Sequence, residues 1–227
     1  MNRKKSRATD YYPIFLNLRS KTGVVVGGGK VALRKVRTLL DCGVDLTVVS
    51  PKPCPEIVKL FKDRLIHLIQ RDYKAGDLKD TVIAIVCTDM KKVNRKVAVD
   101  AKKAGVLVNV ADDPGLSDFI LPSFFRRGDL TVAVSTAGTS PALARKIRKN
   151  LEKSLGREYG MLLSLIGHVR SALKEKRRKV DGKAWEKSID LDLLIPLVRS
   201  GQSKKAETFL LRKLKPYLGD TKTRGLL

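Results

Sequence analysis

The feature that most constrains the fold is a run of three glycines, Gly27-Gly28-Gly29, between a strand-like and a helix-like segment. Residues 22–26 are mostly β-branched, which favours a buried strand, and residues 31–42 repeat apolar side chains at helical spacing. With Ala32 the run follows the pattern G-x-G-x-x-A, which opens a dinucleotide-binding βαβ unit. A plain structural turn is the alternative interpretation of the glycines alone. The flanking elements favour nucleotide binding.

The predicted turn assigns a different task to each part of the motif. Gly27 permits the tight turn, Gly29 lets the backbone approach a pyrophosphate, and Ala32 lets helix and strand pack closely. The helix N-terminus then offers unpaired N–H groups and a partial positive charge to the phosphates. We therefore expect the cofactor to contact Gly27, Gly28, Gly29, Lys30 and Val31.

The second predicted strand, at residues 45–49, lacks the acidic residue that usually holds an adenosine ribose. It is followed instead by Ser50, Pro51 and Lys52. Ser50 can hydrogen-bond a ribose, and Lys52 does not repel a 2′-phosphate. We predict that all three contact the cofactor, and the choice between NAD and NADP stays open on these residues.

Short apolar runs alternate with helical patterns up to about residue 110, which is typical of a parallel sheet covered on both faces. After Pro114 the pattern changes. Two apolar runs, 119–125 and 130–135, flank Gly128 and predict an antiparallel hairpin. A helix then begins at Pro141, capped by Ser140, and the chain reads as helical from about 157. The remaining predicted strands are 65–69, 82–86 and 106–110, and the remaining predicted helices of the sheet region are 54–62 and 91–104.

These patterns predict an α/β protein with three parts. A Rossmann-type parallel-sheet domain occupies residues 1–113, a small hairpin-and-helix region 114–150, and a helical domain 151–227. We expect His67 and His168 to be core or edge residues rather than ligands, because His67 lies in an apolar strand and His168 in an apolar helix, and we expect Trp185 to be a core residue.

The composition describes a strongly basic globular chain. Its formal net charge is +24 over 227 residues, spread along the whole sequence. Such a field attracts nucleic acid, anionic lipid or a small polyanionic substrate, and a solvated basic surface without function is a further alternative.

The basic N-terminus leads into no apolar segment, and no run is long enough to span a bilayer, so we expect a cytoplasmic protein without membrane contact. Three cysteines without paired spacing predict reduced thiols and no metal ligands.

Two segments carry side chains suited to chemistry. Asp112 and Asp113 follow the last sheet strand, where ligands of open α/β sheets bind. Two adjacent carboxylates repel each other, which raises the pKa of one enough for proton transfer, although a simple Asp-Asp-Pro turn is an equal alternative. The segment 135–141 presents hydroxyls and open N–H groups at a helix start, followed by Arg145 and Arg148. We interpret it as a carboxylate or phosphate receptor.

Taken together, the motifs resemble the precorrin-2 dehydrogenase/sirohydrochlorin ferrochelatase family, the dehydrogenase module of sirohaem synthase. No one motif is decisive, but their order is specific, and it covers residues 11–148. The segments that carry the resemblance are Tyr12-Pro13-Ile14-Phe15-Leu16, residues 26–35, Thr47 to Pro51, Cys87-Thr88-Asp89 with Asn94, Asn109 to Pro114, Asp118 to Ser123, and Val132 to Pro141.

The resemblance implies a homodimer whose central region, 114–150, is the dimerisation region. It implies NAD as cofactor and the oxidation of precorrin-2 to sirohydrochlorin, with or without insertion of Fe²⁺. It places the catalytic acid/base on Asp112 and adds Thr88 to the cofactor site. We expect the tetrapyrrole to contact Asn109, Thr136, Gly138, Thr139 and Ser140.

A competing hypothesis from another class is a non-catalytic, NAD-responsive regulator whose basic surface binds nucleic acid. The sequence contains no recognition-helix signature and no basic stripe rich in aromatic residues, so we expect no nucleic-acid partner.

Overall fold

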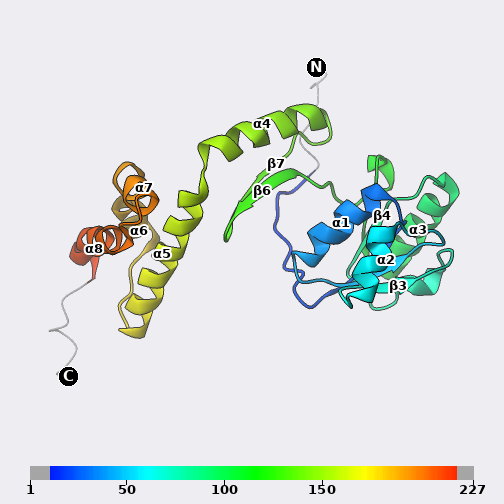
Figure 1. Ribbon diagram of the computed structural model, residues 1–227, viewed down its shortest axis with the longest axis horizontal. Coiled ribbons are helices and arrows are strands. Elements are labelled where there is room, and N and C mark those ends of the chain that lie inside the picture. The colour runs from blue at the N-terminus through cyan, green and yellow to red at the C-terminus, as the bar shows by residue number, and fades with distance from the viewer. Residues whose placement is uncertain (1–10, 219–227) are drawn as a thin grey trace, which may run out of the picture. The chain divides into compact units, whose positions relative to one another are not determined.

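The computed structural model describes residues 11–218, and the chain divides into two units between Leu121 and Pro122 (Figure 1). Each unit is described by itself. The first contains the sheet, and the second contains a hairpin and the C-terminal helices. The finer division into parts ending at residues 113, 150 and 227 stays a prediction.

Five parallel strands make up the sheet of the first unit: β1 (Thr22–Val26), β2 (Asp45–Val49), β3 (His67–Ile69), β4 (Ile83–Val86) and β5 (Leu107–Val110). Their spatial order is β3-β2-β1-β4-β5. The chain builds outward from β1 in one direction and then returns to build outward from β4 in the other. The carboxyl ends of β1 and β4 therefore form the topological switch point, where open sheets of this kind bind ligands.

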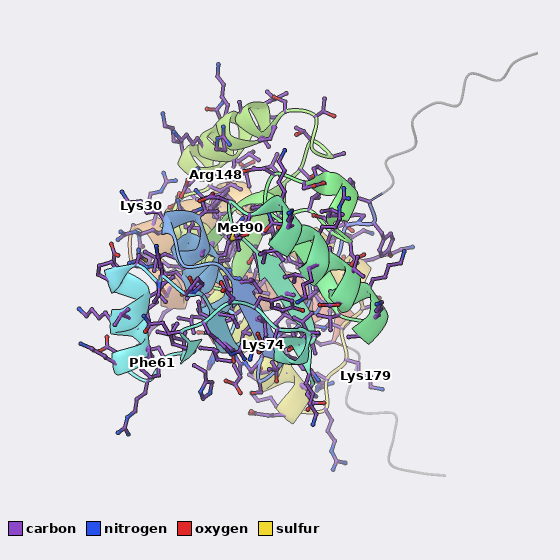
Figure 2. All side chains as sticks on the ribbon, turned by 90° about the vertical axis from the view of Figure 1, so that its right-hand side faces the viewer. Lys30, Phe61, Lys74, Met90, Arg148 and Lys179 are labelled. Carbon is purple, nitrogen blue, oxygen red and sulfur yellow. The ribbon has the colours of Figure 1, made fainter. Side chains whose placement is uncertain are left out.

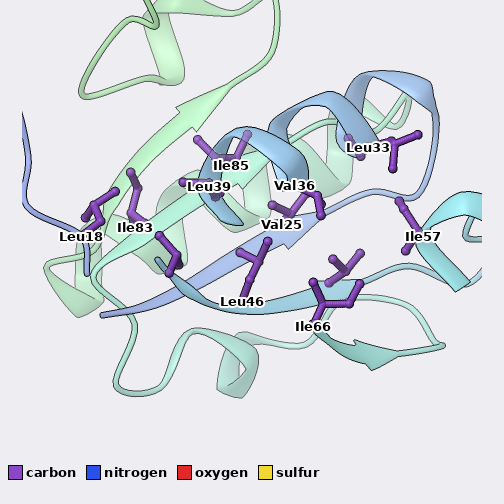
Figure 3. Close-up of a cluster of buried hydrophobic side chains, with 13 residues drawn as sticks. Leu18, Val25, Leu33, Val36, Leu39, Leu46, Ile57, Ile66, Ile83 and Ile85 are labelled. Atoms are coloured by element: carbon purple, nitrogen blue, oxygen red, sulfur yellow. The ribbon is translucent and has the colours of Figure 1, made fainter. Parts of the chain in front are cut away.

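Helices cover both faces of this sheet. Side chains alternate between faces along each strand, so Val25 packs with helix α1 (Lys30–Leu40) and helix α2 (Pro55–Lys62), while Val24 and Val26 pack with helix α3 (Lys91–Ala104). Figure 3 shows Leu33, Val36 and Leu39 of α1 lying over the sheet. Strands buried on both faces account for the nearly continuous apolar runs in the sequence.

The second unit begins with an antiparallel hairpin, β6 (Ser123–Arg127) and β7 (Leu130–Val134). Gly128, with φ of +57°, occupies the first of the two loop residues, a position that favours glycine. The hairpin packs against α4 (Pro141–Ser154) and α5 (Arg157–Glu175). Three further α-helices follow among the residues up to 218: α6 (Gly182–Ser188), α7 (Leu191–Arg199) and α8 (Ser203–Leu214).

The α/β class, the hairpin and the helical C-terminal region are confirmed, and the predicted ends of sheet strands and their helices agree within two residues. The short links Ala75–Leu78, Pro114–Leu116 and Lys215–Tyr217 are 3₁₀ turns. Trp185 packs against the core and His67 lies on an edge strand, as expected, whereas His168 is exposed on α5. His67 lies on the edge strand β3, 3.4 Å from Asp45.

One predicted element was wrong. The first hairpin strand begins at Ser123 and not at Phe119. Phe119 packs instead against the core of the first unit, and the preceding Asp118 pairs with the backbone of β5. Within residues 11–218, no helix has the length and apolar character needed to cross a membrane.

Candidate active site

The glycine turn connects β1 to α1 at the switch point, and Gly27 is required there by both conformation and space. Its φ is +127°, a backbone conformation that L side chains rarely adopt. A Cβ atom on Gly27 would lie 2.3 Å from the carbonyl oxygen of Cys87, directly after β4. The absence of a side chain therefore lets the first turn lie directly against the end of the neighbouring strand.

Gly28 packs against the loop that follows β2. A Cβ atom here would lie 2.4 Å from Ser50 Oγ and 2.8 Å from the Lys52 carbonyl oxygen. The Gly28 carbonyl accepts a hydrogen bond from the Cys54 amide at 2.8 Å. This close approach ties the glycine turn to residues 50–54.

Gly29 differs from both, because no protein atom lies within 4 Å of the position that its Cβ would occupy. Its φ of −86° and ψ of −174° are extended angles that any residue adopts. Neither packing nor conformation thus requires glycine here, whereas a ligand lying against the backbone would. The empty space therefore fits the predicted pyrophosphate position.

The N-terminus of α1 faces the same edge. Gly29 caps the helix without a side-chain hydrogen bond, and no acidic residue lies in the first turn. The first intrahelical bond runs from the Leu33 amide to the Gly29 carbonyl, so the amides of Lys30, Val31 and Ala32 precede the helical ladder. Figure 2 shows Lys30 and Met90, at the starts of α1 and α3, toward one end of the first unit, with Phe61 and Lys74 toward the other. This arrangement suits a dinucleotide phosphate.

The residues after β2 form a turn at the same edge. Ser50 is buried, and its hydroxyl oxygen accepts the Lys52 amide at 3.3 Å. Pro51 and Lys52 are exposed. Ser50 therefore shapes the surface beneath Gly28, while the exposed pair lies where a ribose would be expected. Their contact with the cofactor stays a prediction.

Thr88 follows β4 and is engaged with the start of α3. Its hydroxyl donates to Asn94 Oδ1 at 2.5 Å and accepts the Met90 amide at 3.2 Å. Asn94 in turn donates to the Thr88 carbonyl at 3.0 Å. This reciprocal pair fixes the backbone on the far side of the switch point from α1, and its contact with the cofactor stays a prediction.

Asp112 lies just beyond β5 in a strained conformation. Its φ is +61°, in the left-handed region that few residues other than glycine adopt, although Asp and Asn tolerate it best. The side chain is exposed. The Ala111 amide donates to the Val86 carbonyl at 2.8 Å, which ties this turn to the end of β4. The exposed carboxylate is therefore accessible to a ligand bound at this edge of the sheet.

Electrostatic interactions connect Asp112 with Lys35 of α1 and with Cys87 after β4. Burial lowers the pKa of the half-buried Lys35 ammonium, while electrostatic interactions with Cys87 and Asp112 act in the opposite direction. Burial also raises the pKa of the Cys87 thiol to about 11, opposed by Lys35 and Arg34. Sequence reasoning missed Lys35 as part of the site. The only signal was its place one turn into the helix that follows the glycines.

The raised pKa of the Cys87 thiol predicts how its alkylation rate depends on pH. Only the thiolate reacts with an alkylating agent, so the alkylation rate of Cys87 by iodoacetamide should rise about tenfold per pH unit from pH 8 to 10. Peptide mass spectrometry measures each cysteine separately, and denatured protein serves as the control. A plateau near pH 9 in the folded protein would show that burial does not suppress ionisation of this thiol.

Asn109 has a structural partner as well as a place at this edge. Its buried side chain donates to the Phe119 carbonyl at 2.8 Å. Ser117 and Asp118 also bond the backbone of β5, so residues 117–119 run along the strand through side-chain contacts. Asn109 thus fixes the segment that leaves the first unit, and its contact with the substrate stays a prediction.

The predicted anion-receptor loop lies in the second unit. Ala137 and Gly138 both have positive φ, +49° and +82°, and the Ser140 amide donates to Thr136 Oγ1 at 3.1 Å. Ser140 caps α4 through the Leu143 amide, which confirms the predicted cap. Gly138 and Thr139 are exposed. The loop is therefore ordered by its own hydrogen bonds around an exposed tip.

Arg148 does not extend this receptor as expected. It pairs with Glu152, four residues later on α4, and the same carboxylate lies 3.6 Å from Arg127 of the hairpin. The Arg127 guanidinium also donates to the Glu152 carbonyl at 3.1 Å. The Arg148 guanidinium therefore belongs to a cluster with Glu152 and Arg127 that holds β6 against α4. The spacing of Arg145 and Arg148 in the sequence does not indicate this pairing.

The structure thus brings together Gly27 to Val31, Ser50 to Lys52, Thr88, Asn109 and Asp112 at the carboxyl edge of one sheet. Thr136, Gly138, Thr139 and Ser140 form a loop of the second unit. Among residues 11–218, no three His, Cys, Asp or Glu side chains are grouped so that they could hold a metal ion.

Comparisons with known proteins match two successive stretches of the chain. A family described as "Putative NAD(P)-binding" matches residues 14–123, and one described as "Sirohaem biosynthesis protein central" matches residues 127–154. The two matches together cover more than half of the chain.

Individual proteins extend the similarity toward the C-terminus. A sirohaem synthase from Ruthia magnifica subsp. Calyptogena magnifica is 35% identical over 217 residues, which is 95% of this chain and 45% of the relative. One from Tolumonas auensis is 38% identical over 90% of this chain and 44% of its own length. The chain thus spans less than half the length of these curated relatives.

A solved structure of "SirC, precorrin-2 dehydrogenase" covers 91% of this chain, and this chain covers all of it, with 25% identity and a TM-score of 0.68. That likeness includes the parallel sheet, the hairpin and the helical region. The chain therefore belongs to the precorrin-2 dehydrogenase/sirohydrochlorin ferrochelatase family, corresponding to the dehydrogenase module of sirohaem synthase.

Proposed function

We propose that this chain oxidises precorrin-2 to sirohydrochlorin with NAD⁺. The observation that carries the proposal is that the dinucleotide turn and the exposed Asp112 carboxylate lie at the same edge of the sheet. The similarity to SirC, described as a precorrin-2 dehydrogenase, supports this substrate.

The residues at this edge of the sheet have separate proposed roles in cofactor binding and proton transfer. The backbone of Gly27 to Val31 holds the cofactor phosphates, and the space beside Gly29 accommodates them. Bound NAD⁺ supplies the acceptor for a hydride from the substrate. The proton released from the oxidised substrate goes to the Asp112 carboxylate, which passes it to solvent. One hydride and one proton leave, so the reaction yields sirohydrochlorin, NADH and a proton.

Electrostatics favour an anionic substrate. Precorrin-2, the substrate associated with this family, carries eight carboxylates, and the chain has a formal net charge of +24. A positive field steers such a substrate toward the protein and stabilises it once bound. The loop from Thr136 to Ser140, whose tip at Ala137 to Thr139 is exposed, is the proposed carboxylate receptor.

The direct test is the absorbance at 340 nm after mixing the chain with NAD⁺ and precorrin-2. NADH formation that requires all three components supports the proposal. NAD⁺ binding without NADH formation, together with retention of duplex DNA at physiological salt, would favour the regulator hypothesis instead.

Replacing NAD⁺ by NADP⁺ in this assay determines the preferred cofactor, and adding Fe²⁺ with detection of sirohaem tests chelation. The cytoplasmic location stays a prediction.

We further propose that the chain acts as a homodimer through the hairpin and α4. Leu143 and Ile147 lie four residues apart on α4 and are 50% and 38% exposed, and Phe124 of β6 is 37% exposed. Large apolar side chains at this spacing form a stripe that another subunit would cover.

The dimer predicts the effect of a charge in this stripe. Leu143→Asp combined with Ile147→Asp should convert the dimer to a monomer, because two carboxylates would have to be buried at the interface. Light scattering coupled to size-exclusion chromatography measures the mass. Leu193→Asp is the matched control, since Leu193 of α7 is equally exposed but lies outside the stripe. A wild-type monomer, or a double variant that stays dimeric, would contradict the proposed interface.

A further inference from the structure

A hollow between α7 and α8 combines an apolar floor with a cationic rim. Its volume is about 440 Å³, and it is lined by Leu197, Lys204, Lys205, Thr208, Phe209 and Arg212. Leu197 and Phe209 are partly buried and pack against the helical core, so the floor is held in place by the fold. We refer to these six residues as the α8 groove.

Helical spacing explains how the cations come to surround the floor. Lys204, Thr208 and Arg212 follow one another at intervals of four, so they lie along one line of α8, beside Lys205 and Phe209. Eight residues of helix separate the lysines at one end from the arginine at the other, a rise of about 12 Å. The groove therefore presents positive charge at both ends of a half-buried aromatic side chain.

The aromatic ring also positions the cations. The Arg212 guanidinium lies 5.4 Å from the centre of the Phe209 ring, and the Lys213 ammonium lies 5.5 Å from it. A guanidinium stacked on a ring keeps its N–H donors available at the edge of the plane, where a carboxylate binds. Residues 203–217 contain five lysines and arginines and one acid, Glu207, so little charge within this segment opposes the field.

We propose that the α8 groove binds a tetrapyrrole carboxylate as a second site, besides the one that uses Asp112. A flat apolar ring with carboxylates on its rim matches an apolar floor between cations separated along a helix. The identification of the ligand as a tetrapyrrole rests on the proposed function, whereas the affinity for a polycarboxylate rests on the groove itself. Such a site would hold substrate or product on the same chain that oxidises it.

Two other anionic partners fit the groove less well. A bilayer would require a broad exposed apolar face, but Ala206, Leu210 and Leu214 of α8 are buried in the core. Single-stranded nucleic acid usually stacks on a succession of aromatic side chains, whereas the lining of the groove contains Phe209 alone. A compact polycarboxylate is therefore the favoured occupant.

The test uses uroporphyrin, a stable eight-carboxylate porphyrin, as the probe. Fluorescence titration at physiological salt gives the number of sites per chain for three proteins. The groove variant is Lys204→Gln/Lys205→Gln/Arg212→Gln. The matched control is Lys174→Gln/Lys176→Gln/Arg177→Gln, which removes the same charge from an exposed segment of the same unit. We expect the groove variant to bind one porphyrin fewer per chain than wild type and control, with affinity at the lost site lowered at least tenfold.

The outcomes separate this proposal from the proposed function. Equal site numbers in all three proteins, or the same loss in the control, would overturn the α8 groove as a tetrapyrrole site even if NAD⁺-dependent oxidation of precorrin-2 is observed. Loss of binding to phosphatidylglycerol vesicles in the groove variant, with porphyrin binding unchanged, would overturn it as well. A porphyrin site lost only in the groove variant, without any precorrin-2 oxidation, would support the groove and refute the proposed function. Circular dichroism verifies that each variant is folded.

Discussion

Gly29→Val should weaken NAD⁺ binding by about tenfold or more, roughly 1.4 kcal/mol, while the protein stays folded. The expected loss arises because the new side chain would occupy the space into which the cofactor pyrophosphate must come. The fold should survive, since no protein atom lies within 4 Å of the added Cβ and the backbone angles at Gly29 suit any residue. Isothermal calorimetry measures the affinity, and thermal unfolding measures the stability.

Gly28→Ala is the matched control for this prediction. Its Cβ would lie within 3 Å of Ser50 Oγ, the Lys52 carbonyl oxygen and Pro53 Cα, so the loop after β2 would have to move. We expect a lower Tm for Gly28→Ala and an unchanged Tm for Gly29→Val. If folded Gly29→Val binds NAD⁺ as tightly as wild type, the pyrophosphate does not lie at this turn and the cofactor assignment is wrong.

The difference between these two glycines also shows what the sequence can and cannot predict. The motif predicts the turn, because a strand, three glycines and a helix in this order have few structural solutions. It does not reveal which glycine is required by packing, since Gly28 meets a loop that starts 22 residues later. Non-local contacts of this kind depend on how strands pair, and the pairing becomes visible only in the folded sheet.

The same reasoning applies to the polar side chains of the site. The positions of Thr88, Asn109 and Asp112 after successive strands follow from the alternation of strands and helices, and the sequence predicts their common edge. Their hydrogen-bond partners are less predictable, because Thr88 is engaged by Asn94 and Asn109 by the carbonyl of Phe119. The prediction of Asn109 as a substrate contact did not include its hydrogen bond to Phe119, because no local sequence pattern indicates that bond.

Charges near Asp112 illustrate a further limit. Composition predicts a basic protein, but it does not distinguish a solvated lysine from one that is partly buried and interacts electrostatically with a carboxylate. Lys35 lies on the face of α1 between exposed and core positions, and its pKa is lowered by burial. The sequence analysis considered only Asp113 as an electrostatic neighbour of Asp112, and it left out Lys35 of α1 and Cys87 after β4.

Asp112→Asn should lower kcat for precorrin-2 oxidation by roughly 10²-fold or more, the scale for removing a positioned general base. Asparagine tolerates the left-handed conformation at φ +61° almost as well as aspartate, so the turn should be retained and only the proton acceptor lost. NAD⁺ affinity should change little, because the proposed cofactor contacts lie in the glycine turn and the loop after β2. Stopped-flow absorbance at 340 nm measures the hydride step, and calorimetry measures NAD⁺ binding.

Asp113→Asn distinguishes the two adjacent carboxylates. The Asp113 carbonyl accepts the Ser117 hydroxyl at 2.8 Å, and Asp113 directly precedes the turn Pro114–Leu116. These contacts use the backbone of Asp113, so exchange of its carboxylate for an amide should cost far less activity than the exchange at Asp112. Full activity in both variants would leave the pair with a turn-forming role only and would refute proton transfer to Asp112. Loss of activity in Asp113→Asn alone would assign the proton acceptor to Asp113, whose backbone φ is negative, and not to Asp112.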